Sequence, residues 1–485
     1  MHDPRSLSSA TTLARALRAR DVTATELVAS CLSRIERLNP SINAVVWLQA
    51  EAALERARAA DAAVDRGDFW GPLHGVPITV KECFDWTGSP STFGRPSRAA
   101  HRPSANAAAV QRLVDAGAIL LGKTNVPVDL ADWQSFNPLY GMTRNPWSAA
   151  HSPGGSSGGA AAALATGMSA LELGSDHSGS IRMPAHFCGV YGHKPTYGIV
   201  PVHGHWLVEG SPPDDLNVVG PLARSAEDLD LAMRVLAGPL PAQARAWSLS
   251  LPDPGHARVA GLRIAVLTTD ALFPVDEATR TTARSIAHVL AHAGATVEVD
   301  PALPAPSRQC YELSLALARA ATAFRRDAAD IAAMRAQADR LDPDDRGYEA
   351  LMLRGLTQSH RDWLDRHAER EHLRRAWATF FERHDLLVAP VSPTAAFEHI
   401  TDTPKADQRL LVDGVARPMS DTYFWIGLAS AAGLPSTVIP AGQSADGRPI
   451  GLQIIGPEYH DLHGIALARA LESLHRGFTA PPGYA

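Results

Sequence analysis

Two glycine-serine loops separated by a run of small residues constrain this chain more than any other feature. The first loop, residues 151–159, reads His-Ser-Pro-Gly-Gly-Ser-Ser-Gly-Gly, and the second, residues 174–182, reads Gly-Ser-Asp-His-Ser-Gly-Ser-Ile-Arg. The alanine-rich stretch between them, residues 160–173, predicts a helix, because alanine is the best helix former. Alone, the pattern is as typical of a tight turn that packs a helix against a sheet as of a reactive site.

A lysine upstream gives these loops a chemical interpretation. Lys81 ends the apolar run 76–81, which predicts a short buried strand that carries the lysine. Serine needs an activated partner to act as a nucleophile, and a desolvated neutral lysine can be that base. Two serines and one lysine therefore suffice for a proton relay without histidine.

Strand-like and helix-like segments alternate along the 485 residues. This alternation predicts an α/β fold, with one large domain over residues 1–485 and a central mixed, mostly parallel sheet flanked by helices on both faces. Residues 310–385 are charged and have helical periodicity almost throughout, which predicts a helical insertion or cap.

Composition narrows the class of protein. The chain is 45% hydrophobic and 20% charged, as globular enzymes are, and its net charge of −6 disfavours nucleic acid as a partner. The four cysteines are scattered and no histidines stand at metal-ligand spacing, so we expect reduced thiols, no metal and no cofactor. Without a signal-like apolar segment or a run of 18 apolar residues, the sequence predicts a cytoplasmic protein with no membrane contact.

Two shorter motif matches have the wrong local context. Residues 117–124 fit the phosphate-loop pattern, but the four residues between the glycines form an apolar strand whose N–H groups belong to a sheet. Pro127 also falls where the helix of a phosphate loop would run. Ser157 fits the GxSxG pattern of α/β-hydrolases, but residues 145–153 before it resemble a loop and not the required strand.

Taken together, the motifs resemble those of the amidase signature family. The matching segments occur in the order of that family and extend from the first quarter of the chain nearly to its end: residues 75–81, 122–125, 152–159, 174–185, 189–195 and 450–456. The resemblance implies that Lys81 is the base, Ser156 the bridging serine and Ser180 the nucleophile. It also implies a cis peptide bond before Ser156.

The same resemblance implies an oxyanion hole made of backbone N–H groups. The donors are those of His177, Ser178, Gly179 and Ser180. The family commonly has two glycines before the nucleophile, whereas this chain has Ser178 and Gly179. If position 178 requires a positive φ, serine there costs energy. Asp176 and Arg182 resemble positions that brace the loop, and His177 either lines the substrate pocket or packs at its mouth.

Candidate substrate contacts come from three segments near these motifs, residues 132–134, 203–206 and 423–425. We expect the pocket to include Asp132, Trp133, Gln134, His177, Trp206 and Trp425. The aromatic side chains favour an apolar or aromatic substrate, although large aromatic residues are also typical of a core. Asp132 would instead suit a cationic substituent.

Three functions remain open from the sequence. The leading one is hydrolysis of a linear carboxylic amide, and also of esters, through an acyl-enzyme on Ser180. The alternative is the amidase (glutaminase) subunit of a tRNA-dependent amidotransferase, which would need tRNA and a further protein partner; the acidic net charge and the aromatic candidates argue against it. The third, a non-catalytic binding protein, is disfavoured by the intact Lys81, Ser156 and Ser180. Homodimers are common in the family, but no sequence feature here indicates one.

Overall fold

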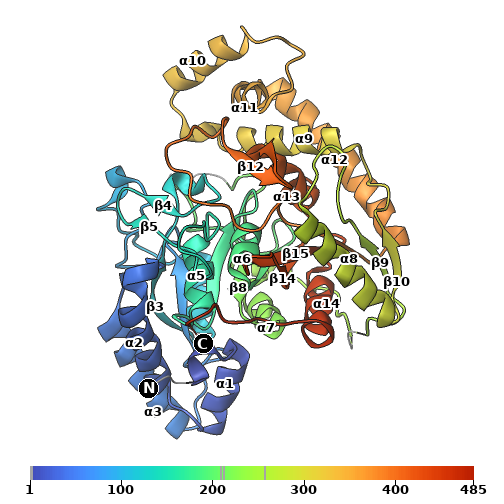
Figure 1. Cartoon of the computed structure of the whole chain (residues 1–485). Helices are drawn as coiled ribbons and strands as arrows, with labels where there is room; N and C mark the ends of the chain where they lie inside the picture. The colour runs from blue at the N-terminus through green and yellow to red at the C-terminus, as the bar shows by residue number, and fades with distance from the viewer. Residues whose placement is uncertain (1–3, 208–209, 211–212, 256–257, 485) are drawn as a thin grey trace.

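A single sheet of eleven strands forms the centre of the molecule (Figure 1). The computed structural model describes residues 4–207, 210, 213–255 and 258–484. Within these residues the strand order is β1-β3-β2-β6-β8-β7-β14-β15-β11-β9-β10, and fourteen α-helices flank the sheet. The predicted single-domain α/β architecture with a mixed sheet is confirmed.

The strand directions differ from the predicted, mostly parallel arrangement. Of the ten neighbouring pairs among the described strands, four are parallel (β3–β2, β2–β6, β11–β9 and β9–β10), and six are antiparallel, including the outermost pair β1–β3. Buried strands have continuous apolar runs in either direction, so the hydrophobic pattern did not reveal the antiparallel centre. The central sheet strands are β1 (Val45–Leu48), β2 (Pro77–Lys81), β3 (Ile119–Thr124), β6 (Glu172–Asp176), β7 (Tyr191–Lys194), β8 (Val218–Ala223), β9 (Arg263–Val266), β10 (Thr296–Val299), β11 (Leu386–Pro390), β14 (Ser436–Gln443) and β15 (Pro449–Ile455).

The helices and the two small hairpins surround this sheet. The helices are α1 (Ala10–Ala19), α2 (Ala24–Ile42), α3 (Ala50–Asp65), α4 (Ala108–Asp115), α5 (Gly158–Ala165), α6 (Arg182–Cys188), α7 (Ala226–Leu236), α8 (Glu277–His292), α9 (Ser307–Ala320), α10 (Ala328–Ala338), α11 (Tyr348–Thr357), α12 (His360–Arg383), α13 (Thr422–Ser430) and α14 (Asp461–Leu474). Strand β4 (Phe136–Asn137) pairs with β5 (Gly141–Met142), and β12 (Arg409–Val412) pairs with β13 (Val415–Pro418). No described helix combines the length and the apolar character that crossing a membrane requires.

The small-residue run between the two serine loops is shorter as a helix than the sequence predicts. Helix α5 ends at Ala165, and β6 begins at Glu172 in the middle of the sheet, between β2 and β8. Every residue of α5 is buried. A Cβ atom on Gly159 would lie 2.3 Å from the Asn125 backbone nitrogen, so only glycine permits this close packing against the end of β3.

The position of strand β3 shows that residues 117–124 do not form a phosphate loop. Gly122 and Lys123 lie within this strand, as the apolar pattern predicts. The buried Lys123 ammonium group donates hydrogen bonds to the backbone carbonyls of Glu82 and Phe84, at 3.1 and 2.6 Å. Lys123 therefore ties the chain after β2 to β3 and is not placed to hold a phosphate.

Candidate active site

One cavity brings the two serine loops together with segments from the C-terminal half of the chain. The serine loops and the strand before the second loop contribute Ser156, Ser175, His177, Ser178 and Ser180 to its lining. Residues distant in sequence also line it, among them Arg319, Arg325, Tyr348, Lys405 and Tyr423. Because β2, β6 and the start of α5 deliver Lys81, Ser175 and the first loop to this point, the sheet fixes the geometry of the site.

Lys81 and Ser156 are in direct contact at the base of this site. Lys81 is the last residue of β2 and its side chain is fully buried. Its Nζ lies 2.7 Å from Ser156 Oγ and 2.9 Å from Ser175 Oγ. Burial disfavours the charged form and lowers the pKa of Lys81 to about 8. A substantial fraction of the lysine is therefore neutral, and able to accept a proton, at mildly alkaline pH.

The first loop is tied to the second by a backbone hydrogen bond. The Ser157 N–H donates to the Ser180 carbonyl oxygen at 3.1 Å, and both Ser156 and Ser180 face the same cavity. The peptide bond between Gly155 and Ser156 is cis, as the resemblance implies. Ser157 is buried and its Oγ lies 3.4 Å from the Ser175 carbonyl oxygen, so it does not occupy the exposed turn that a GxSxG nucleophile requires.

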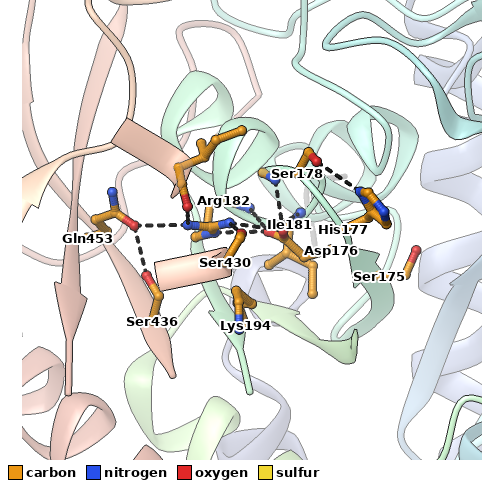
Figure 2. A network of polar contacts seen from close by, with 12 residues as sticks. Ser175, Asp176, His177, Ser178, Ile181, Arg182, Lys194, Ser430, Ser436 and Gln453 are labelled. Atoms are coloured by element: carbon orange, nitrogen blue, oxygen red, sulfur yellow. Dashed lines mark hydrogen bonds and ion pairs between the residues drawn. The ribbon is translucent and has the colours of Figure 1, made fainter. Parts of the chain in front are cut away.

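A buried ion pair braces the second loop (Figure 2). Arg182 contacts Asp176 through Nε at 3.0 Å and Nη2 at 3.1 Å, and it also donates to Ser430 Oγ at 2.6 Å and to the Ile426 carbonyl. Burial alone would raise the pKa of Asp176, but the Arg182 charge and hydrogen bonds outweigh it and hold that pKa well below its usual range. Asp176 thus remains ionised and anchors the loop to α13.

Asp176 also binds one of the predicted oxyanion donors. The Gly179 N–H donates to Asp176 Oδ1 at 2.8 Å, with Gly179 at a φ of 89°. The N–H groups of His177, Ser178 and Ser180 donate to no other described residue. Ser178 is not among the described residues with a positive φ, so the serine in place of the family's glycine adds no backbone strain.

His177 lies on the cavity wall, where its Nδ1 has a hydrogen-bond partner and its buried Nε2 has none among the described residues. Its Nδ1 is 2.8 Å from Ser178 Oγ, and its Nε2 is 4.0 Å from Asp214. Burial lowers the pKa of His177, which favours a neutral imidazole at neutral pH. The Trp133 indole N–H donates to the Ser178 carbonyl at 2.8 Å and fixes the same stretch of backbone.

A second chain of polar contacts reaches Lys81 through Ser175. Asn217 Nδ2 lies 3.1 Å from His205 Nδ1, and His205 Nε2 lies 2.8 Å from Ser175 Oγ. Ser175 in turn contacts Lys81. Burial, with the nearby Lys81 charge, lowers the pKa of His205 to about 3, so its imidazole stays neutral and orients Ser175 by hydrogen bonding. His205 lies in the candidate segment 203–206, but no sequence signal indicates its contact with Ser175 or the contribution of Asn217.

The structure separates the predicted substrate contacts into two groups. Asp132, Trp133 and His177 line the cavity. Gln134 is buried and bonds to the backbone of residue 400, Trp206 lines a neighbouring cavity and donates to Asp85, and Trp425 is fully buried in the core. These last three side chains are engaged elsewhere. The cavity wall is more polar than predicted, because Arg319, Arg325 and Lys405 converge on it.

A lysine buried beside a serine, with a second serine on a braced loop, is an arrangement in which lysine rather than histidine can act as the base of a hydrolase. Comparisons with known proteins agree with this class. The family model named Amidase matches residues 26–463. A glutamyl-tRNA(Gln) amidotransferase subunit of Chloroflexus aurantiacus is 35% identical over 488 residues, which cover 96% of this chain and 96% of that protein.

Two solved structures are similar over nearly their whole length. A bacterial aryl acylamidase is 28% identical with a TM-score of 0.80, covering 98% of this chain and 97% of that one. The peptide amidase of Stenotrophomonas maltophilia is 27% identical with a TM-score of 0.77, covering 99% of both chains. The chain belongs to the amidase signature family and is an enzyme acting on carbon–nitrogen bonds. The non-catalytic alternative is therefore set aside.

Proposed function

We propose that this enzyme hydrolyses a linear carboxylic amide through an acyl-enzyme on Ser180. The observation that carries the proposal is the 2.7 Å contact between the buried Lys81 Nζ and Ser156 Oγ beside the cavity that Ser180 lines. Lys81 takes a proton from Ser156, Ser156 takes the proton of Ser180, and Ser180 Oγ attacks the carbonyl carbon.

The tetrahedral intermediate places its negative charge on the former carbonyl oxygen. We assign its stabilisation to the N–H groups of His177, Ser178 and Ser180, since that of Gly179 is engaged by Asp176. The relay then runs in reverse: the proton passes back through Ser156 to the leaving nitrogen, and the carbon–nitrogen bond breaks. Water hydrolyses the acyl-enzyme and restores free Ser180.

The comparisons favour the alternative function, a glutaminase subunit, over the amidase with an apolar or aromatic substrate that the sequence suggested. The C. aurantiacus relative is named as part of an amidotransferase, and it matches this chain nearly end to end. The aromatic argument against this alternative weakens as well, because Trp206 and Trp425 do not line the described cavity. In this interpretation glutamine supplies the amide, while tRNA and a second protein complete the assembly.

Two substrates separate these interpretations. The test compares ammonia release from glutamine with aniline release from acetanilide, using the purified chain alone and then with candidate partner proteins. Ser180→Ala serves as the inactive control. Glutamine turnover that increases on adding the partner supports the amidotransferase interpretation. Turnover of the aryl amide alone supports a free-standing amidase.

We further propose that the 310–385 segment acts as a cap on one domain that spans residues 1–485. Helix α9 supplies Arg319 and α11 supplies Tyr348 to the cavity wall. Figure 1 shows α10 and α11 at the outer end of the molecule, beyond β12. This position lets the helices define one side of the substrate pocket without forming part of the central sheet.

A further inference from the structure

Two arginines on the wall of the catalytic cavity form no ion pair with a described carboxylate, although the charges of Asp214 and Asp129 act on Arg325 from farther away. Arg319 lies near the end of α9, and Arg325 ends the short 3₁₀ turn Ala323–Arg325 that follows it. Both line the cavity that contains Ser156 and Ser180. Within the described ranges, neither guanidinium group lies within ion-pair distance of a carboxylate.

The hydrogen bonds of these arginines leave donors free. Arg319 Nη2 donates to the hydroxyl groups of Tyr348, at 2.9 Å, and Tyr423. Arg325 Nη1 donates to the Asp129 carbonyl oxygen at 2.8 Å. The Nε atoms of both side chains are buried and have no partner in the part of the chain that the structure describes. Buried polar groups normally have partners, so these two donors require an explanation.

Asp132, the acidic residue among the described residues that line the cavity, already forms an ion pair with Lys405. Asp132 lies 3.4 Å from Lys405, and both residues line the cavity. Elsewhere in the molecule the buried Arg182 has a bidentate carboxylate partner in Asp176. The contrast indicates that Arg319 and Arg325 obtain their counter-charge from something that enters the cavity. A guanidinium fork matches the geometry of a carboxylate.

We propose that the substrate carries a carboxylate beyond the scissile amide, and that Arg319 and Arg325 hold it. This inference rests on the proposed amide hydrolysis and names its substrate class. Among the described residues, the cavity offers no free acidic group for an ammonium, because Asp132 is paired with Lys405. The preferred substrates are therefore amides with a carboxylate and without a neighbouring ammonium, so this inference goes with the free-standing amidase and not with the glutaminase alternative. Two sources provide this chemistry, the half-amides of dicarboxylic acids and the N-acyl amino acids.

Matched substrates test the charge requirement. Glutaramate is glutamine without its ammonium group, and its methyl ester removes the carboxylate charge; N-acetylglycine represents the second source. We expect kcat/KM to be at least about tenfold higher for glutaramate or for N-acetylglycine than for the corresponding methyl ester, because only the acid offers the guanidinium groups a charged acceptor. We also expect glutaramate to equal or exceed glutamine. A preference for the methyl esters, or for glutamine by tenfold or more, would overturn the proposal.

Variants assign the effect to the two arginines. Arg319→Met and Arg325→Met should each reduce kcat/KM at least tenfold more for the acid than for its methyl ester, mainly through KM, and Arg319→Lys should restore part of the loss. Arg326→Met is the matched control, because this exposed neighbour does not line the cavity. Equal losses on acid and ester in both variants would contradict the assignment.

A binding measurement separates this inference from the failure of amide hydrolysis. Glutarate is titrated by calorimetry into Ser180→Ala, alone and combined with Arg325→Met. Binding that the second substitution weakens at least tenfold supports the carboxylate site even if no amide is cleaved. Absence of glutarate binding to a folded Ser180→Ala protein, together with wild-type hydrolysis of neutral amides, leaves the proposed function intact and refutes the carboxylate site.

Discussion

Lys81 is the residue on which the chemistry depends most. Its ammonium group is removed from water at the end of β2, where the neighbouring polar atoms are hydroxyl groups and one carbonyl and not carboxylates. Desolvation therefore dominates and lowers the pKa of Lys81 to about 8 from 10.5. The base is accessible near physiological pH because the fold supplies no counter-charge in contact with it among the described residues.

The pH dependence of kcat/KM should follow this lysine. Only neutral Lys81 accepts a proton, so activity should rise with pH and level off above about 8. His205, with a pKa lowered to about 3, does not titrate in that range. Rates measured from pH 6 to 10 check the prediction, and Lys81→Ala should lose the inflection. A profile that is flat from pH 6 to 9, or that levels off only above 10, would contradict it.

Lys81→Ala should affect amides more than esters. The relay must deliver a proton to a leaving amine, whereas an alkoxide leaving group needs that help less. We expect amide kcat to fall by at least about 100-fold, the ordinary contribution of general acid–base catalysis, and ester kcat by less. Matched amide and ester substrates with the same acyl group give the comparison. Equal losses would show that Lys81 has no role in leaving-group protonation.

At the scale of single residues, the sequence predicts which residues of the proposed catalytic set lie together better than it predicts the lining of the pocket. Lys81, Ser156 and Ser180 each lie in a contiguous sequence motif, so each can be identified from its neighbours along the chain. Arg319 and Tyr348 reach the cavity only because distant helices fold over it, which no local pattern records. Trp425, two residues beyond Tyr423, points into the core instead, since successive residues of a helix face different directions.

Among the elements, β6 links the catalytic loop to the centre of the sheet. Glu172 begins this strand, and its buried carboxyl accepts hydrogen bonds from Thr79 of β2 and, at 3.4 Å, from Thr124 of β3. Burial raises the pKa of Glu172 to about 8 despite these bonds. A protonated carboxyl group therefore joins three adjacent strands beneath the site.

The difference in stability between Glu172→Gln and the wild type should shift in favour of the variant as pH rises. The unfolded carboxyl releases its proton near pH 4.5, whereas the folded one keeps it up to about 8, so the folded state binds more protons between these values and wild-type stability falls. Glutamine has no such proton to retain. Melting temperatures at pH 5, 6, 7 and 8 check this, with the exposed Glu51→Gln as control. A difference in melting temperature that stays constant over this range would refute the prediction.

Element boundaries and strand directions were less predictable than element types. The capping box of Thr23 and Glu26 marks the start of α2 correctly, since it is a local hydrogen-bond pattern. Proline usually ends or kinks a helix, yet α2 continues to Ile42 with Pro40 in its last turn. Likewise, residues 172–173 look helical beside an alanine run, but tertiary pairing with β2 and β8 draws them into the sheet.

For the whole molecule, one sheet connects two halves that the sequence does not separate. Strands β7, β14 and β15 join the N-terminal block to β9, β10 and β11 within one continuous ladder. A second core cluster, to which α12 and α13 contribute, contains Trp377, Phe380 and Phe424. The active site lies where elements from both halves meet, so its geometry depends on the entire sheet.

This continuity predicts one cooperative unfolding transition. Calorimetry should give a single endotherm, and Trp377→Ala should shift all of it to lower temperature, since emptying such a site costs about 3–5 kcal/mol. An exposed substitution such as Trp247→Ala serves as the control. Two resolved transitions, only one of which responds to Trp377→Ala, would show that the halves are separate domains.

The central claim is that Ser180 forms the covalent intermediate. A fluorophosphonate probe followed by peptide mass spectrometry tests it most directly, because the probe reacts with an activated serine whatever the natural substrate is. We predict a single adduct on Ser180 in the wild type, a much slower reaction in Lys81→Ala, and no adduct in a folded Ser180→Ala protein. An adduct on Ser156 or Ser157, or undiminished labelling of Ser180→Ala, would contradict the account.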